Sequence, residues 1–182
     1  MSHSEVRPSF TGLILHREPT LGYSFFVPDG WHRLAVDGEE GTSVLYAPSI
    51  DDPFTSISVV GRDLGVEARA SDLPDLRAGF RRGLRQFPKS RVESVEAESV
   101  GNLITIEGRH TFPDGGATRK RWVRLLYQGT LLVRIVAQAT SVAEFAYWEP
   151  MFFQTIRTFR FGDWAVDVGV ATDDWLVRPT ES

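Results

Sequence analysis

The chain has no cysteine among its 182 residues. A disulfide framework, a thiolate metal site and a cysteine nucleophile are therefore excluded, and the composition fits a reducing cytoplasm. The chain also lacks the roughly eighteen consecutive apolar residues of a membrane span, and its start, MSHSEVRPSF, lacks the charged and apolar regions of a secretory signal. We expect a cytoplasmic protein that is neither secreted nor inserted in a membrane.

Positive charge is not in excess. The 20 Lys and Arg residues are outnumbered by 24 Asp and Glu residues, which gives a formal net charge of −4 and a pI near 5.6. Because nucleic acids attract proteins mainly through positive charge, this balance argues against nucleic acid as a partner.

Familiar catalytic and metal-binding motifs are missing as well. The sequence contains no G-x-S-x-G elbow, and His16, His32 and His110 do not have the spacing of helical or finger-like ligand motifs. The PDGG segment at 113–116 lacks the strand-to-helix context of a phosphate-binding loop, so it predicts a hairpin turn. We therefore expect no catalytic residue, no metal and no cofactor.

What is present begins with strands joined by turns. Short apolar or alternating runs occupy Leu13–His16, Tyr23–Val27, Ser43–Ala47 and Ser56–Gly61. Between the second and third runs, FVPDGW at 26–31 has proline, aspartate and glycine in the order of a chain reversal.

One amphipathic helix is predicted over residues 72–87. Asp72 supplies capping oxygens, Pro74 lies in the first turn and Pro88 ends the helix. Its leucine and phenylalanine side chains share one face, which indicates packing on a core. Elsewhere the helix carries an arginine ridge, which is either a solvated surface or a contact for an acidic partner. The ridge consists of Arg77, Arg81, Arg82 and Arg85.

A meander of four strands is predicted over residues 91–140, with loops at 101–102, 113–116 and 128–129. One face of the meander then collects Val95, Ala97, Ile104, Ile106, Val123, Leu125, Leu132 and Val136. The other face collects Val100, Leu103, Trp122, Leu126, Leu131, Val133 and Ile135. Two apolar faces need cover on both sides.

A second predicted helix can cover the second apolar face of the meander. Ser141 and Glu144 form a capping box, and Pro150 is expected to kink the helix or to start another short one. Its apolar stripe, centred on Trp148, consists of Phe145, Trp148, Phe152, Ile156 and Phe159. The predicted fold class is therefore α+β, with a central, mainly antiparallel sheet covered by helices on both faces in an α/β/α sandwich.

Charged residues gather on one face of the meander. They are Glu96, Glu98, Glu107, Lys120 and Arg124. They form either a general acid–base cluster or a cross-strand ladder of opposite charges, and we favour the ladder. Glu107 and His110 lie three residues apart on a strand and so point to opposite faces. We expect His110 to oppose Glu93 or Arg119 as an ordinary polar pair.

The segment after Phe161 alternates apolar and small or polar residues, which is typical of a half-buried strand. Its apolar members are Trp164, Val166, Val168 and Val170, and Trp175 follows. We expect this segment to dock on an edge of its own sheet, on a second subunit or in a partner's groove. Residues 1–161 are expected to form a single domain, with 1–9 disordered and 162–182 as a C-terminal extension.

Three segments carry a resemblance to a known fold. They are YSFFVPDGW (23–31), YQGTLLVRIVAQA (127–139) and FAYWEPMFFQTIRTFRF (145–161). Together with the order of elements from Leu13 to Phe161, they resemble the PsbP-like fold. That fold is shared by an extrinsic photosystem protein, a Ran-binding nuclear import factor, small bacterial lipoproteins and secretion-effector chaperones. The resemblance implies an antiparallel sheet with helices on both faces and a non-enzymatic binding or assembly role, without catalytic residues to carry over.

Three functional hypotheses follow. The leading one is a non-catalytic protein-binding adaptor or chaperone of the bacterial cytoplasm, with secretion effectors as candidate clients and with a homodimer as one arrangement. Its predicted contact residues are the arginine ridge together with Trp164, Val166, Val168 and Trp175.

The alternatives are a small-ligand binder or enzyme, and a self-associating structural protein. The first would use an aromatic pocket between sheet and helix lined by Trp31, Trp122 or His32. A concave pocket with convergent polar groups would favour ligand binding, whereas a flat exposed apolar patch would favour protein binding.

Overall fold

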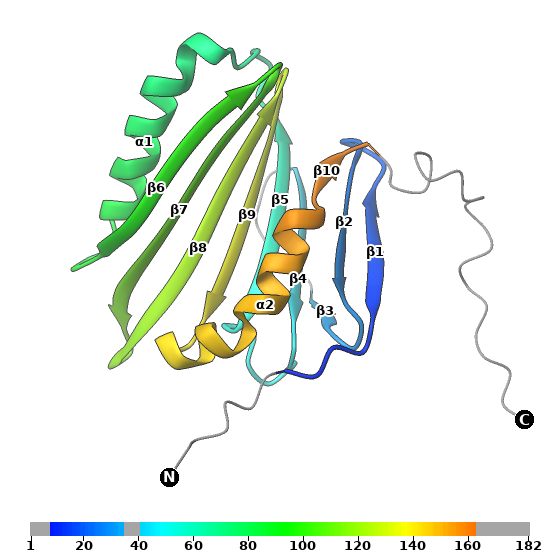
Figure 1. Cartoon of the computed structure of the whole chain (residues 1–182), viewed down its shortest axis with the longest axis vertical. Helices are drawn as coiled ribbons and strands as arrows, with labels where there is room; N and C mark the ends of the chain where they lie inside the picture. Colours follow the sequence, from blue (N-terminus) through cyan, green and yellow to red (C-terminus); the bar gives the residue numbers. More distant parts are fainter. Residues whose placement is uncertain (1–7, 35–40, 163–182) are drawn as a thin grey trace, which may run out of the picture.

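The computed structural model describes residues 8–34 and 41–162, and Figure 1 shows their arrangement. The predicted docking segment with Trp164, Val166, Val168 and Trp175 lies outside the described residues.

Within the described residues, ten strands form two antiparallel sheets. The smaller sheet has the order β1-β2-β10 and consists of β1 (Leu13–Glu18), β2 (Tyr23–Pro28) and β10 (Arg160–Phe161). The larger sheet has the order β3-β4-β5-β9-β8-β7-β6. Its strands are β3 (His32–Leu34), β4 (Thr42–Ala47), β5 (Ser56–Asp63), β6 (Arg91–Val100), β7 (Leu103–Asp114), β8 (Ala117–Gln128) and β9 (Leu131–Ala139).

Two helices complete the described fold. Helix α1 (Leu73–Arg85) follows a short 3-10 turn, Ala70–Asp72, and α2 (Val142–Thr158) follows β9. The Ser141 side chain accepts a hydrogen bond from the Glu144 backbone N–H at 3.0 Å, which confirms the serine half of the predicted capping box. The Glu144 carboxylate instead accepts a hydrogen bond from Trp148 Nε1 at 2.7 Å. Pro150 does not divide α2, which continues as one helix to Thr158.

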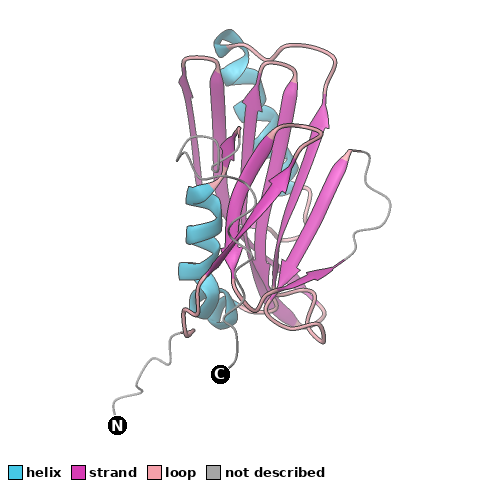
Figure 2. Ribbon diagram, turned by 90° about the vertical axis from the view of Figure 1, so that its right-hand side faces the viewer, coloured by secondary structure: helices cyan, strands magenta, loops and turns pink. Residues whose placement is uncertain are grey.

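Two hydrophobic clusters pack on opposite faces of the larger sheet, because successive side chains of a strand alternate between its faces. Leu126 and Val133 belong to the cluster that contains α2 and the smaller sheet. Val123 and Leu132 belong to the cluster that contains α1. In Figure 2 the helix α1 lies behind the strands of the larger sheet, and in Figure 1 α2 lies between that sheet and β2.

The α+β class and the mainly antiparallel sheet are thus confirmed. The finer expectation of a helix layer over each whole face is not established. Helix α1 packs mainly on β6 and β7, and α2 shares its side of the larger sheet with β2. Part of the sheet face beside α1 therefore remains without helical cover.

Candidate functional site

A groove of about 450 Å³ runs between α1 and strands β8 and β9. Its sheet side is mostly apolar and presents Val123, Leu125, Tyr127 and Val136. Its helix side presents Leu76, Gly79, Phe80, Gly83 and Leu84. The volume lies within the range of known ligand pockets, about 300–1,000 Å³. An apolar groove of this size can hold a small molecule or a short chain segment.

Two glycines widen the groove from the helix side. Gly79 and Gly83 are four residues apart, so they lie on the same side of α1. A Cβ atom placed on Gly83 would meet no heavy atom within 4 Å, and one on Gly79 would meet only the Arg82 Nη2 atom, at 3.7 Å. A glycine inside a helix lowers stability by about 1 kcal/mol relative to alanine. Since a Cβ atom would fit at both positions, close packing does not require glycine there. Their effect is to leave the groove open.

The groove is elongated and has different charges at its two ends. Arg121 and Tyr127 both line it and are six residues apart on β8, which corresponds to about 20 Å at the rise of a strand. Phe87 follows the C-terminal end of α1 and contacts Arg121, whereas Asp75 lies in the first turn of α1. The basic end therefore lies at the C-terminus of α1 and the acidic residue at its N-terminus.

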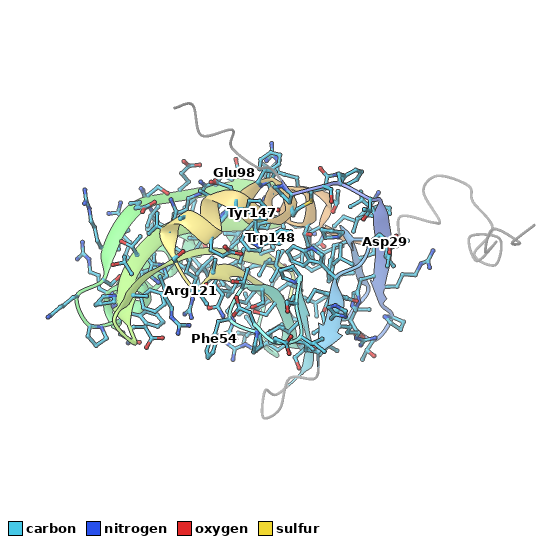
Figure 3. All side chains as sticks on the ribbon, turned by 90° about the horizontal axis from the view of Figure 1, so that it is seen from below. Asp29, Phe54, Glu98, Arg121, Tyr147 and Trp148 are labelled. Atoms are coloured by element: carbon cyan, nitrogen blue, oxygen red, sulfur yellow. The ribbon has the colours of Figure 1, made fainter. Side chains whose placement is uncertain are left out.

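Arg121 is the central charged group of the basic end. Its guanidinium carbon lies 4.9 Å from the ring centres of both Phe87 and Phe112. Its Nε and Nη2 atoms donate to Gln138 Oε1 at 3.0 and 2.6 Å. Burial, followed by the charges of Arg119 and Arg134, lowers the pKa of Arg121. No carboxylate of residues 8–34 and 41–162 forms an ion pair with it. Figure 3 shows Arg121 on the opposite side of the sheet from Trp148.

His110 lies directly opposite Arg121 in the register of β7 and β8 and is fully buried. Its ring stacks on Phe112, with 5.4 Å between ring centres, and Phe87 lies at the same distance. Neither ring nitrogen has a hydrogen-bond partner within the described part of the chain. Burial, helped by the Arg121 charge, lowers the pKa of His110 to about 4, so the ring is neutral at pH 7.

The expected polar pairing of His110 is wrong. The structure pairs His110 with Val92 and Arg121 rather than with Glu93 and Arg119. The β7–β8 loop contains only residues 115–116, which moves the partner on β8 by two positions. A register shift between Val92 and Ser94 moves the partner on β6 by one.

The two buried histidines make stability depend on pH. Burial, followed by the Arg33 charge, also lowers the pKa of His16 to about 4, from 6.5. Above pH 6.5 both rings are neutral in the folded and unfolded chains. As the pH falls towards 4, the unfolded chain takes up protons that the folded chain does not, so the free energy of unfolding decreases.

Urea unfolding at several pH values between 7.5 and 4.5 measures this slope. We expect His110→Phe to reduce the slope by close to one proton. A slope for His110→Phe equal to that of the wild type would show that His110 is protonated as readily in the folded chain as in the unfolded one.

The arginine ridge lies on exposed positions of α1. Arg77 Nη2 donates to the Val95 carbonyl of β6 at 3.4 Å, which places this side of the helix towards the sheet edge. Within the described residues, Arg81, Arg82 and Arg85 form no ion pair. The Arg77 contact places that residue on the β6 side of α1, whereas the Arg82 guanidinium lies near Gly79, which lines the groove.

The charge ladder is present in part. Arg124 Nη1 lies 3.7 Å from Glu107 Oε2 on the neighbouring strand, and Lys120 Nζ lies 3.0 Å from Glu93 Oε2. These pairs bridge β6, β7 and β8 as ordinary cross-strand contacts. No group of three metal-binding side chains occurs in the part of the chain that the structure describes.

The three residues expected to line an aromatic pocket lie elsewhere in the fold. Trp122 is buried in the cluster beneath α2, with the Arg109 guanidinium 4.1 Å from its ring centre. Trp31 packs against Trp148, and His32 is exposed on β3. None of the three lines the groove beside α1. The signal that sequence reasoning missed is the pair of glycines four residues apart inside an otherwise strong helix.

Comparison with known proteins finds similarity only at the level of structure. No family model matches the chain, and no curated protein matches its sequence. The solution structure of cyanobacterial PsbP from Synechocystis is similar, with a TM-score of 0.63 and 14% identity over 86% of this chain and 98% of that one.

Two further structures have the same architecture. The Ran-binding protein Mog1p of Saccharomyces cerevisiae matches with a TM-score of 0.56 and 15% identity, over 84% of this chain and 96% of that one. LpqN of Mycobacterium tuberculosis, described as involved in cell envelope biogenesis, matches with a TM-score of 0.55 and 12% identity, over 84% and 91%. The chain has the PsbP-like fold, as the three sequence segments indicated. Neither described helix has the length and apolar character to cross a membrane.

Proposed function

We propose that the protein is a non-catalytic adaptor or chaperone of the bacterial cytoplasm that holds a segment of another protein in the groove beside α1. The observation that carries this proposal is the shape of the groove: it is elongated, apolar along its floor and widened by Gly79 and Gly83. An extended segment rises about 3.3 Å per residue, so about six residues span it. Secretion effectors are candidate clients, and a homodimer is one form in which the adaptor could act.

The polar groups of the groove support binding rather than turnover. A general base needs a nucleophile or an orienting group within hydrogen-bond reach. His110 has no such partner among the described residues, and its pKa of about 4 makes it a weak base. The structurally similar Mog1p is described as a Ran-binding protein, which fits the same proposal.

A small-ligand binder is the second candidate function. The observation that favours it is the convergence of Arg121 and His110 on one end of an otherwise apolar groove, since ligand pockets typically combine apolar walls with a few placed polar groups. Both candidates use the same groove and differ in what occupies it.

The proposal is tested by filling the groove. Gly83→Leu places a side chain in the space beside α1, whereas Ala78→Leu adds the same side chain at an exposed position of the same helix. Wild-type and variant proteins are used to capture partners from native bacterial lysate, followed by quantitative mass spectrometry. We expect the same partner with the wild type and Ala78→Leu, and at least a ten-fold lower yield with Gly83→Leu.

Equal capture by all three proteins would contradict the groove as the protein-binding site. In that event the arginine ridge is the next surface to test. The double replacement of Arg81 and Arg82 by glutamate would weaken a complex with an acidic partner and flatten its salt dependence.

A further inference from the structure

The basic end of the groove contains an arginine without an ion pair and a buried histidine without a hydrogen-bond partner among the described residues. Arg121 carries a positive charge, has no ion pair within the described residues and is only partly exposed. His110 beside it is fully buried, with both ring nitrogens lacking a hydrogen bond in the described chain. A buried donor or acceptor without a partner costs about 1–3 kcal/mol. Native proteins rarely retain such a group without a reason.

We infer that this end of the groove is a carboxylate-binding site, formed by Arg121 with His110 behind it, and that the ligand carries a carboxylate attached to an apolar chain or ring. The inference rests on the proposed function in one respect, namely that the groove is the binding site. It adds the chemical class of the ligand, which the groove's shape alone does not specify.

The geometry of Arg121 fits this role. Its Nε and Nη2 atoms donate to the Gln138 side chain, and the guanidinium also contacts the rings of Phe87 and Phe112. These contacts hold the guanidinium in place. The Nη1 group remains available to a ligand. An arginine held in this way loses little side-chain freedom when it binds an anion, and arginine binds planar carboxylates with particular geometric fit.

His110 adds a second donor to the same site. A neutral imidazole carries one N–H, which can donate to a carboxylate oxygen. The ring is covered by Phe87, which belongs to the short turn after α1 and is only partly buried. Contact between ligand and His110 therefore requires a shift of the Phe87 side chain, whereas Arg121 is reached from the groove directly.

The rest of the groove favours a ligand with an apolar chain or ring. Beyond Arg121 the floor presents Val123, Leu125 and Tyr127, which bind an apolar chain by burying its surface, and Arg134, which pairs with Leu125 on the neighbouring strand. Asp75 at the N-terminal end of α1 would repel a second carboxylate at the far end.

Two matched pairs of probes test the inference on the full-length protein. One pair is 4-phenylbutyrate and its carboxamide. The other is an N-acetylated pentapeptide of leucine and phenylalanine that ends in a free carboxylate or in a carboxamide. We expect calorimetry to show the acid of at least one pair binding about ten-fold more tightly than its amide, the equivalent of one additional charge-assisted hydrogen bond.

Variants then locate the preference. Arg121→Gln should reduce the ratio of acid to amide affinity to below about three-fold, because the charge that distinguishes the acid from the amide is removed. Arg121→Lys should retain part of the preference. The control Arg62→Gln makes the same charge change at an exposed position of β5, outside the groove lining, and should keep the full ratio.

The histidines provide a readout within the same molecule. Binding of the acid should shift the ring signals of His110 in NMR spectra and raise its pKa, because a negative charge beside the ring stabilises the imidazolium. The signals of His16, which stacks on Phe25 in the other hydrophobic cluster, should not move.

Each outcome has a separate meaning. A preference for the acid only in the small-molecule pair identifies a small acid as the ligand, and one only in the peptide pair identifies the C-terminus of a protein segment. Equal binding of acid and amide in both pairs overturns the carboxylate site and leaves the groove as a binding site. Absence of binding by all four probes overturns this inference, while the capture experiment with Gly83→Leu decides the proposed function independently.

Discussion

Replacing Phe152 by alanine is expected to lower the free energy of unfolding by about 3–5 kcal/mol. Phe152 lies in the middle of α2 and is fully buried. Its ring contacts Phe145, with 5.3 Å between ring centres, and Trp31, at 5.9 Å. Removing it opens a cavity between α2 and both sheets, where the surrounding side chains cannot close the space completely. Urea denaturation at constant pH measures the change.

The neighbouring Phe153 is a matched control, because the same substitution there removes the same atoms from an exposed position. Phe153 is 48% exposed. We expect Phe153→Ala to cost less than about 1 kcal/mol. Trp148, which the apolar stripe placed at the centre of α2, lies at the rim of the cluster and packs on Trp31. Its replacement should cost less than that of Phe152. Equal losses at 152 and 153 would contradict the packing of α2 described above.

Gly108→Ala is expected to destabilise the protein by about 1–3 kcal/mol, although alanine is only one methyl group larger. A Cβ atom at Gly108 would lie 2.7 Å from Phe80 Cε1, 3.1 Å from Leu84 Cδ1 and 3.0 Å from the Ser94 carbonyl oxygen. These atoms belong to α1 and β6, so the absence of a side chain at this position of β7 allows α1 to approach the sheet. The added methyl group must push α1 outwards, which weakens its packing and changes the width of the groove.

Gly83→Ala, on the helix that packs over Gly108, is expected to have the opposite effect on stability. A Cβ atom there meets nothing within 4 Å, and alanine favours the helix by about 1 kcal/mol over glycine. We expect this variant to be more stable than the wild type by a similar amount. Thermal and urea unfolding of both variants should therefore show changes of opposite sign. A Gly108→Ala protein as stable as the wild type would mean that α1 does not depend on that close approach.

Local signals in the sequence accounted for most of the elements. The hairpin at 101–102 is a two-residue loop with Gly101 at a φ of 60°, a conformation that glycine adopts without strain. Apart from Val100 and Leu131, the residues of the two predicted apolar faces of the meander also belong to the two hydrophobic clusters. Although the loop at 113–116 is two residues shorter than expected, the assignment of faces survives, because a register change of two leaves every side chain on the same face.

The same register change explains why the site was not found. A shift of two positions keeps His110 on its face but replaces Arg119 by Arg121 as its partner, so the buried histidine and the arginine were not placed side by side. The sequence did not predict the short strands β3 and β10, because they too depend on pairing between strands. They contain three and two residues and exist only through pairing with β4 and β2.

The sequence by itself determined the features that depend on neighbours along the chain: the alternation of strands, the amphipathic face of α1, the cap of α2, and the absence of thiol chemistry. The tertiary structure decided the separation into two sheets, the approach of α1 over Gly108 and the groove with Arg121 and His110 at one end. Those features depend on contacts between residues far apart in the sequence. Their distances follow from exact register and close packing, which composition and periodicity do not specify.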